Sequence, residues 1–227
     1  MNESPPKTTV KKTTVKKTTV KKTTVKKTTV KKTTARKTSS ATIPVSADVE
    51  YTYTLKIPKD RIAVVIGKAG EKKTEFQKEL GVRMQIDSKE GEVVITGKDS
   101  LKVYMLHEVV RAIARGFNPE TASLLLKQDY MLEIVNIMDY SKKKNHVPRL
   151  RGRVIGTKGK SRATIEELTQ THVCVYGKTI GIIGDSGSVT IAKRAIESLL
   201  GGSTHATVYK FLEKSRKEMK RREMIGY

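Results

Sequence analysis

Val65-Ile66-Gly67-Lys68-Ala69-Gly70 and Val154-Ile155-Gly156-Thr157-Lys158-Gly159 are two versions of one short sequence, 89 residues apart. Each places an aliphatic pair before two glycines that are separated by two residues. A Gly-x-x-Gly turn lets the backbone bend sharply and lets another molecule approach without meeting a Cβ. One copy would be weak evidence in a chain with 16 glycines, because the same spacing ends many helices. Two copies in similar surroundings indicate a duplicated module.

The residues around the first copy predict the order strand, helix, helix, strand, strand, helix. Apolar and polar residues alternate from Tyr51 to Ile57, as in a strand with one buried face, and Pro58 ends the alternation. The expected elements are a strand over 51–57, helices over 61–66 and 71–80, strands over 82–86 and 93–96, and a helix from Asp99 with apolar positions at Val103, Leu106, Val110 and Ile113.

The same order repeats around the second copy. The expected elements are a strand over 131–137, helices over 150–155 and 160–168, strands over 173–176 and 179–183, and a helix over 188–200 with apolar positions at Val189, Ala192, Ile196 and Leu199. Between the modules, Asn118 is expected to cap a short connector helix that reaches Leu126, with Pro119 as its first residue and Glu120 in its first turn. A closing helix is expected over 207–224, docked through Val208, Phe211, Leu212 and Met219.

The chain begins with a different kind of sequence. Residues 11–35 repeat Lys-Lys-Thr-Thr-Val four times and Lys-Lys-Thr-Thr-Ala once, a period of five that fits neither helix nor strand. Paired lysines repel one another and each unit offers one small apolar residue, so the segment cannot offset its chain entropy by burial. We expect residues 1–47 to be a disordered basic arm, followed by modules over 48–117 and 118–227. The arm either holds nucleic acid loosely or is a dispensable solubilising extension.

Charge and cysteine content narrow the function. The formal net charge of +23 indicates a polyanionic partner. The lone Cys174 excludes an intramolecular disulfide and a zinc site built from several thiolates, and it fits a reducing compartment. The apolar runs are far shorter than the roughly 18 residues that a membrane span needs, and the N-terminus lacks the apolar stretch of a secretory signal. We therefore expect a cytoplasmic protein that has no membrane association and binds nucleic acid.

The paired loops favour a K-homology (KH) fold of type I, an α+β module that binds single-stranded RNA. In this module the loop clamps the backbone of about four nucleotides, while the bases lie along an aliphatic groove. Unpaired amides at the start of the following helix add donors and a partial positive charge. With no Trp and three Phe, the composition does not favour a platform of stacked aromatic rings in place of that groove. The residues expected to contact RNA are Arg61, Gly67, Lys68, Ala69, Gly70, Arg151, Arg153, Gly156, Thr157, Lys158, Gly159 and Lys160.

Catalysis and metal binding find no support in the sequence. His172 and Cys174 share one face of a strand, but two ligands do not make a zinc site, and a buried cysteine beside a polar histidine is the simpler interpretation. The other histidines, at positions 107, 146 and 205, belong to no recognisable nucleophile motif. We expect no enzyme activity, no cofactor and no metal.

Three stretches of the second module, one of which includes its Gly-x-x-Gly loop, resemble the partner-of-Nob family of small-subunit ribosome assembly factors. They are Arg153 to Lys160, Ile165 to Thr169 and Val175 to Asp185, and the ending Thr204-His205 with Val208 to Glu213 is similar as well. The resemblance covers roughly residues 48–224. It implies binding near the 3′ end of small-subunit ribosomal RNA, where that end is positioned for the Nob endonuclease, and, in archaeal members, contact with an initiation factor subunit.

An intact Gly67-Lys68-Ala69-Gly70 in the first module resembles the archaeal form, because eukaryotic members tend to lose it. One departure is Lys73, which stands where such modules usually carry an aliphatic residue. Two other functions stay open: a general nucleic-acid chaperone dominated by the arm, and a scaffold in which one module has given its surface to a protein partner.

Overall fold

The computed structural model describes residues 50–141 and 144–225, apart from the side chains of Lys144 and Glu223. The arm expected over residues 1–47 lies outside the described residues. None of the helices that the structure describes is both long and apolar enough to cross a membrane.

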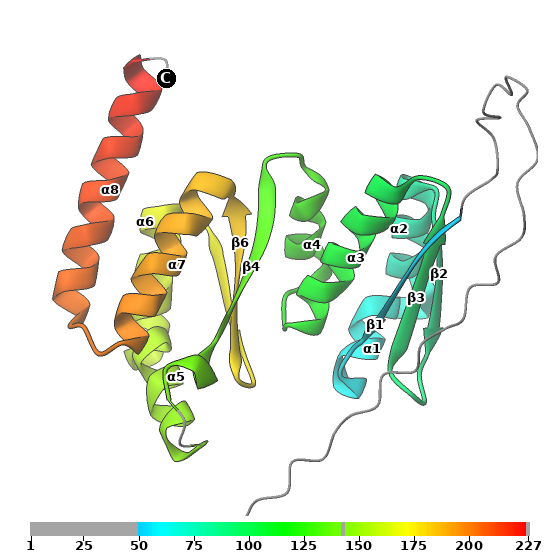
Figure 1. Ribbon diagram of the computed structural model, residues 1–227, viewed down its shortest axis with the longest axis horizontal. Helices are drawn as coiled ribbons and strands as arrows, with labels where there is room; N and C mark the ends of the chain where they lie inside the picture. The colour runs from blue at the N-terminus through cyan, green and yellow to red at the C-terminus, as the bar shows by residue number, and fades with distance from the viewer. Residues whose placement is uncertain (1–49, 142–143, 226–227) are drawn as a thin grey trace, which may run out of the picture. The chain divides into compact units, whose positions relative to one another are not determined.

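The first module has the predicted order of elements. They are β1 (Tyr51–Lys56), α1 (Lys59–Ile66), a 3-10 turn (Lys68–Gly70), α2 (Glu71–Leu80), β2 (Arg83–Asp87), β3 (Glu92–Gly97) and α3 (Ser100–Ala114). The strands form an antiparallel sheet in the order β1-β3-β2, in which Ile95 of β3 lies opposite Tyr53 on one side and Met84 on the other. The helices cover one face of this sheet (Figure 1). Asp99 caps α3 as expected, because its side chain accepts hydrogen bonds from the amides of Leu101 and Lys102.

The second module repeats this order. Its elements are β4 (Tyr130–Asn136), 3-10 turns at Ile137–Asp139 and Lys144–His146, α5 (Val147–Ile155), a 3-10 turn (Thr157–Gly159), α6 (Lys160–Thr169), β5 (His172–Tyr176), β6 (Thr179–Asp185) and α7 (Ser186–Leu200). The strand order β4-β6-β5 matches that of the first sheet. The closing helix α8 spans His205–Ile225 and packs on α6 and α7. Helix α5 begins before the expected residue 150, because Pro148 suits the first turn of a helix.

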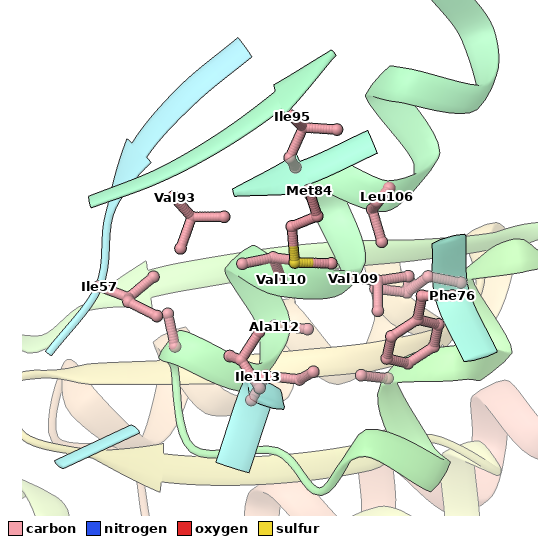
Figure 2. Packing of buried hydrophobic residues seen from close by; sticks show 14 of the residues in the cluster. Ile57, Phe76, Met84, Val93, Ile95, Leu106, Val109, Val110, Ala112 and Ile113 are labelled. Atoms are coloured by element: carbon pink, nitrogen blue, oxygen red, sulfur yellow. The ribbon is translucent and has the colours of Figure 1, made fainter. Parts of the chain in front are cut away.

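Each module has its own hydrophobic core between its sheet and its helices. Figure 2 shows the first core, where Met84 and Ile95 from the sheet meet Leu106, Val110 and Ile113 from α3. The four apolar positions predicted on α3 and the four on α7 are all buried. The helical periodicity of the sequence therefore identified the inward faces of both final helices correctly.

Burial along β1 is weaker than its alternation predicted. Ile57, which follows the strand, is buried, whereas Tyr51 and Tyr53 are 41% and 39% exposed. Strand β1 lies at the edge of its sheet, and the Tyr53 ring packs against Tyr104 and His107 of α3, with centroids 6.4 Å and 5.5 Å apart. A polar aromatic cluster thus replaces the core contact expected at this end of the strand.

The connector between the modules is shorter than a regular helix. Helix α4 covers only Pro119–Ala122 and tightens into a 3-10 turn over Ser123–Leu126. Asn118 occupies the cap position, but its side chain makes no capping hydrogen bond, so that part of the prediction is wrong. Ala122 and Leu125 are buried in the core of the first module. Their burial, rather than a side-chain cap, holds the connector in place.

Strand β6 is buried on both faces. Ile180 and Ile182 belong to the core of the second module, whereas Ile183 belongs to the core of the first. Gly181 shares the face of Ile183, and a Cβ built there would lie 2.5 Å from Cε2 of Phe117. The described residues of both modules accordingly belong to one compact unit. The boundary expected between residues 117 and 118 stays a prediction, but apolar contacts cross it.

Gly181→Ala should destabilise the protein, because the new methyl group would overlap the Phe117 ring. We expect the free energy of unfolding to fall by about 1–3 kcal/mol, the usual cost of overpacking a core, measured by urea denaturation. Gly152→Ala is the control, because a Cβ at Gly152 of α5 would meet nothing within 4 Å. Helical alanine should leave stability unchanged or raise it. Equal stability of Gly181→Ala and wild type would contradict this account of the packing.

Candidate RNA-binding interface

The two Gly-x-x-Gly loops adopt the same backbone conformation. Gly67 and Gly156 have φ and ψ of 75° and −177° in the first loop and 74° and 176° in the second. The third residues, Ala69 and Lys158, have φ of 51° and 53°, and both final glycines are left-handed as well. Non-glycine residues pay roughly 1–2 kcal/mol for this region, so each loop holds a local strain. The duplicated sequence therefore encodes a duplicated shape.

The first glycine of each loop has no room for a side chain. A Cβ at Gly67 would lie 2.8 Å from the Cβ of Lys72, and one at Gly156 would lie 2.6 Å from the Cβ of Ser161. Both contacts are shorter than real Cβ atoms show, because the loop passes close over the first turn of the next helix. The final glycines, Gly70 and Gly159, face open space instead.

The loop tips and the starts of the helices that follow them are accessible to an anion. Lys68, Ala69, Thr157 and Lys158 are exposed. Helices α2 and α6 begin at left-handed glycines and have no side-chain cap, so no capping side chain competes for their first amides. Such amides, together with the helix dipole, favour a phosphate group. Exposed Lys160 adds a full positive charge at the start of α6.

Each module has half-buried aliphatic side chains directly before its loop and on its second strand, the kind of side chain that a groove for bases requires. Ile66 and Ile86 of the first module occupy the same aligned positions as Ile155 and Val175 of the second, and all four are partly exposed. The departure noted at Lys73 recurs at the aligned Arg162 of α6. Both modules thus place a cation where an aliphatic residue was expected, and the departure is a shared feature.

Arg61 and Arg153, expected to contact RNA, are both engaged by the backbone. Arg61 donates from Nε to the carbonyl of Ile113, 2.9 Å away, and from Nη2 to that of Phe117, 2.6 Å away. Arg153 donates to the carbonyls of Leu199 and Ser203 at 3.1 Å and 2.5 Å. These acceptors lie in and just beyond the last turn of α3 and of α7, where carbonyls lack helical partners.

The two arginines make equivalent bonds from different positions. When the two loops are aligned, Arg61 and Arg153 lie three residues apart, about one helical turn, yet both reach the end of the final helix of their module. Arg151 makes a single long contact, 3.5 Å, with the carbonyl of Gly177. Sequence reasoning missed the capping role, because it depends on how the first and last helices of a module cross. Direct RNA contact by these arginines stays a prediction.

Comparison with known proteins supports the same fold. Residues 131–217 match a family model described as a eukaryotic type KH domain, type I, and residues 52–111 match one described as a KH domain. A KH domain-containing protein of Methanocaldococcus jannaschii is 52% identical over 171 residues, which cover 74% of this chain and 75% of that protein. Dim2p of Pyrococcus horikoshii is 47% identical, with a TM-score of 0.68, over 72% of this chain and 99% of the solved one. This chain belongs to the PNO1/Dim2p family, the partner-of-Nob proteins.

Two further relatives of the PNO1/Dim2p family carry informative descriptions. A solved complex from Pyrococcus horikoshii, described as a/eIF2alpha, aDim2p and rRNA, contains a chain that is 46% identical, with a TM-score of 0.70, over 74% of this chain and 96% of that one. The RNA-binding protein pno-1 of Caenorhabditis elegans is 31% identical over 143 residues, 60% of this chain. The match spans about half, 52%, of the length of that relative.

The residues considered for a metal site do not form one. His172 is exposed, and Cys174, predicted to be buried, is half-buried and packs against the core of the first module. Burial raises the pKa of the Cys174 thiol, which disfavours the thiolate that a metal would need. Within residues 50–141 and 144–225, no three His, Cys, Asp or Glu side chains gather closely enough to hold a metal ion.

Helix α8 docks on the second module through part of its expected apolar side. Val208 and Leu212 are buried and Met219 is half-buried, but Phe211 is 39% exposed, so its predicted burial is wrong. Val208 and Leu212 are one turn apart, and Phe211 lies at the margin of their face. The basic residues Lys217 and Lys220 of this helix are exposed.

Alanine at the first and last glycine of the second loop should have unequal effects. Gly159→Ala faces open space and should cost about 1–2 kcal/mol of unfolding free energy from its left-handed φ alone. Gly156→Ala adds an overlap with Ser161, so we expect a further loss of about 1–3 kcal/mol. Urea denaturation of both variants measures the difference. Equal losses would show that the close approach of loop and helix does not constrain Gly156.

Replacement of the arginines should separate the capping residues from the exposed one. Arg153→Gln and Arg61→Gln each remove two hydrogen bonds from a cation to carbonyls, and should lower the unfolding free energy by about 1–3 kcal/mol. Arg151→Gln should change it by less than about 0.5 kcal/mol, as exposed positions usually do. Thermal unfolding followed by circular dichroism provides the comparison. If all three variants matched the wild type, the helix-capping role would be wrong.

Proposed function

We propose that this protein binds single-stranded RNA through its two Gly-x-x-Gly loops and acts as an assembly factor of the small ribosomal subunit. The observation that carries the proposal is the closely matching conformation of the two loops, whose tips are exposed and which each lie at the uncapped start of a helix. A phosphodiester can approach these turns closely, and the half-buried aliphatic residues beside them can contact bases. The RNA contacts expected at the loop residues and at Arg61, Arg151 and Arg153 are part of this proposal.

The proposed RNA is the 3′ end of small-subunit ribosomal RNA. Members of the PNO1/Dim2p family are described as pre-rRNA-processing proteins, for example in Coccidioides immitis, and a related Dim2p has been solved with rRNA and a/eIF2alpha. An initiation factor subunit is therefore a proposed partner here too. A Nob-type endonuclease is a second proposed partner, on the family resemblance.

Other expectations from the sequence stay predictions. We expect a binding role without catalysis or a cofactor. We also expect a cytoplasmic location without membrane association. The described residues bear on only one of the two competing functions. A protein-docking scaffold would need blocked loops, and in the part of the chain that the structure describes the tips of both loops are exposed. A chaperone dominated by the arm depends on residues outside the described ones, so experiment must decide it.

RNA binding by the intact chain should depend on the second loop and on the RNA sequence. Thr157→Asp with Lys158→Asp places two carboxylates at the loop tip, where they would repel a clamped phosphate. We expect affinity for a strand ending in the small-subunit 3′ sequence to fall at least about tenfold, or about 1.4 kcal/mol, because the RNA backbone loses one cation and meets two like charges. Fluorescence anisotropy against a scrambled strand, at two salt concentrations, measures the effect.

Two controls complete that measurement. Thr190→Asp with Arg194→Asp makes the same change in charge at exposed positions of α7 and should leave affinity nearly unchanged. A variant lacking residues 1–47 should keep its preference for the 3′ sequence. If affinity instead vanished with the arm, ignored sequence and fell with salt at a slope of about −0.7 per phosphate, the chaperone function would replace the proposed one.

A further inference from the structure

A pocket of about 450 Å³ lies beside the second loop, on the side that faces α8. Gly152 of α5 and Ser161 of α6 line it together with the loop, and His205 and Tyr209 line it from the first turns of α8. Helix α8 follows the six elements of the KH module, so this pocket combines the module with a segment added to it.

The charge of the pocket is entirely positive. Arg149, Arg153 and Lys160 are among its nine lining residues, and none of the nine carries a carboxylate. Arg149 and Lys160 are exposed, so their side chains can meet a ligand from solvent. A pocket of this composition attracts an anion.

Two helices begin at this pocket. Helix α6, of 10 residues, starts at Lys160, and α8, of 21 residues, starts at His205. Thr204 accepts a hydrogen bond from the Thr207 amide at 3.3 Å and so caps α8, whereas α6 has no side-chain cap. The partial positive charges of both helix starts therefore add to the three cations.

Ser161 provides an independent sign of a ligand. Its side chain is 2% exposed, and its hydroxyl has no hydrogen-bond partner among the described residues. A buried hydroxyl without a partner costs about 1–3 kcal/mol, so such groups usually reflect a missing ligand or water. Because Ser161 lies in the first turn of α6 and lines the pocket, its hydroxyl can donate a hydrogen bond to a phosphate oxygen at the helix start.

The first module offers an internal comparison. At the position of Gly152 it has Ala63, and at the position of Ser161 it has Lys72, whose ammonium is paired with Glu75 at 2.8 Å. The chain after α3 continues into the short α4 instead of a long helix like α8. Gly152 weakens the interior of α5, and a Cβ there would enter open space. The second module thus keeps bare backbone where the first carries a side chain.

We propose that this pocket, here called the α8 pocket, binds one nucleotide of the RNA strand next to those held by the Gly156–Gly159 loop. Its phosphate lies at the start of α6, near Ser161, Lys160 and Arg149, and its sugar or base contacts Tyr209. The His205 ring is held in place, since its Nε2 lies 2.9 Å from the carbonyl of Arg153. The inference rests on the proposed function and extends the RNA site of the second module beyond the tetranucleotide of a KH loop.

Strand length tests the proposal with the intact chain. Single-stranded RNAs that grow by one nucleotide from about four, the length a KH loop clamps, are titrated against the protein by fluorescence anisotropy. Gly152→Leu fills the pocket from an exposed helix position, and should lower affinity for the longer strands about tenfold, the order of one lost base contact. Affinity for the shortest strand should stay the same. Ala63→Leu, the aligned change in the first module, should have no such length-dependent effect.

Ser161→Ala separates binding from folding. Removal of a buried hydroxyl that lacks a partner should leave the unfolding midpoint unchanged or raise it, while affinity for the longer strands falls. A structural role for Ser161 would produce the reverse. Arg149→Gln should reduce the slope of log affinity against log salt by about 0.7, the value for one phosphate of a single strand, and the control Arg194→Gln should not.

The outcomes distinguish this inference from the function on which it rests. If the wild type binds the strands, and Gly152→Leu and Ser161→Ala bind each strand length with the same affinity as the wild type, the α8 pocket is not an RNA subsite. If the wild type binds none of them, the proposed function fails, and the inference fails with it. A loss of affinity confined to the longer strands supports both.

Discussion

Each Gly-x-x-Gly loop passes so close to the next helix that its first residue cannot carry a Cβ. At Gly67 and Gly156 the obstacle is the first turn of α2 or α6, and the loop reaches it through left-handed backbone that favours glycine. This close approach fixes where the two helices of a module meet, and it keeps the loop tip exposed. The exposed loop tips and the uncapped starts of α2 and α6, where we propose that phosphate binds, depend on this close approach.

Duplication preserved the bonds of the module more faithfully than its sequence. Arg61 and Arg153 stand one helical turn apart in the aligned modules, yet both close the end of the last helix with paired hydrogen bonds to the same two carbonyl positions. The requirement comes from the carbonyls, which need donors wherever a helix ends inside the protein. Either position on the first helix can supply one. When the two modules are compared, the carbonyl groups that accept these hydrogen bonds occupy matching positions, although the arginines that donate them do not.

Much of the fold could be predicted from the sequence, because periodicity and glycine spacing are local signals. The order of elements, the buried faces of α3 and α7 and the two loops all follow from them. Features that depend on contacts distant in sequence could not be predicted. The Phe117 ring over Gly181, the capping arginines and the α8 pocket each join segments that no local pattern connects. The predicted burial of Tyr53 and of Phe211 was wrong for the same reason, because the exposure of a side chain depends on which residues the neighbouring element places against it.

The burial of β6 on both faces makes two repeats into one folding unit. Ile183 belongs to a core built mainly by the other module, and Phe117 fills the space that Gly181 leaves. A fragment that ends between the modules would expose an apolar sheet face, which favours aggregation. We therefore expect the two modules to unfold together, because the contacts between them contribute to the stability of each. The two modules can differ in their binding surfaces, but the apolar residues on both faces of β6 are covered only when the modules are together.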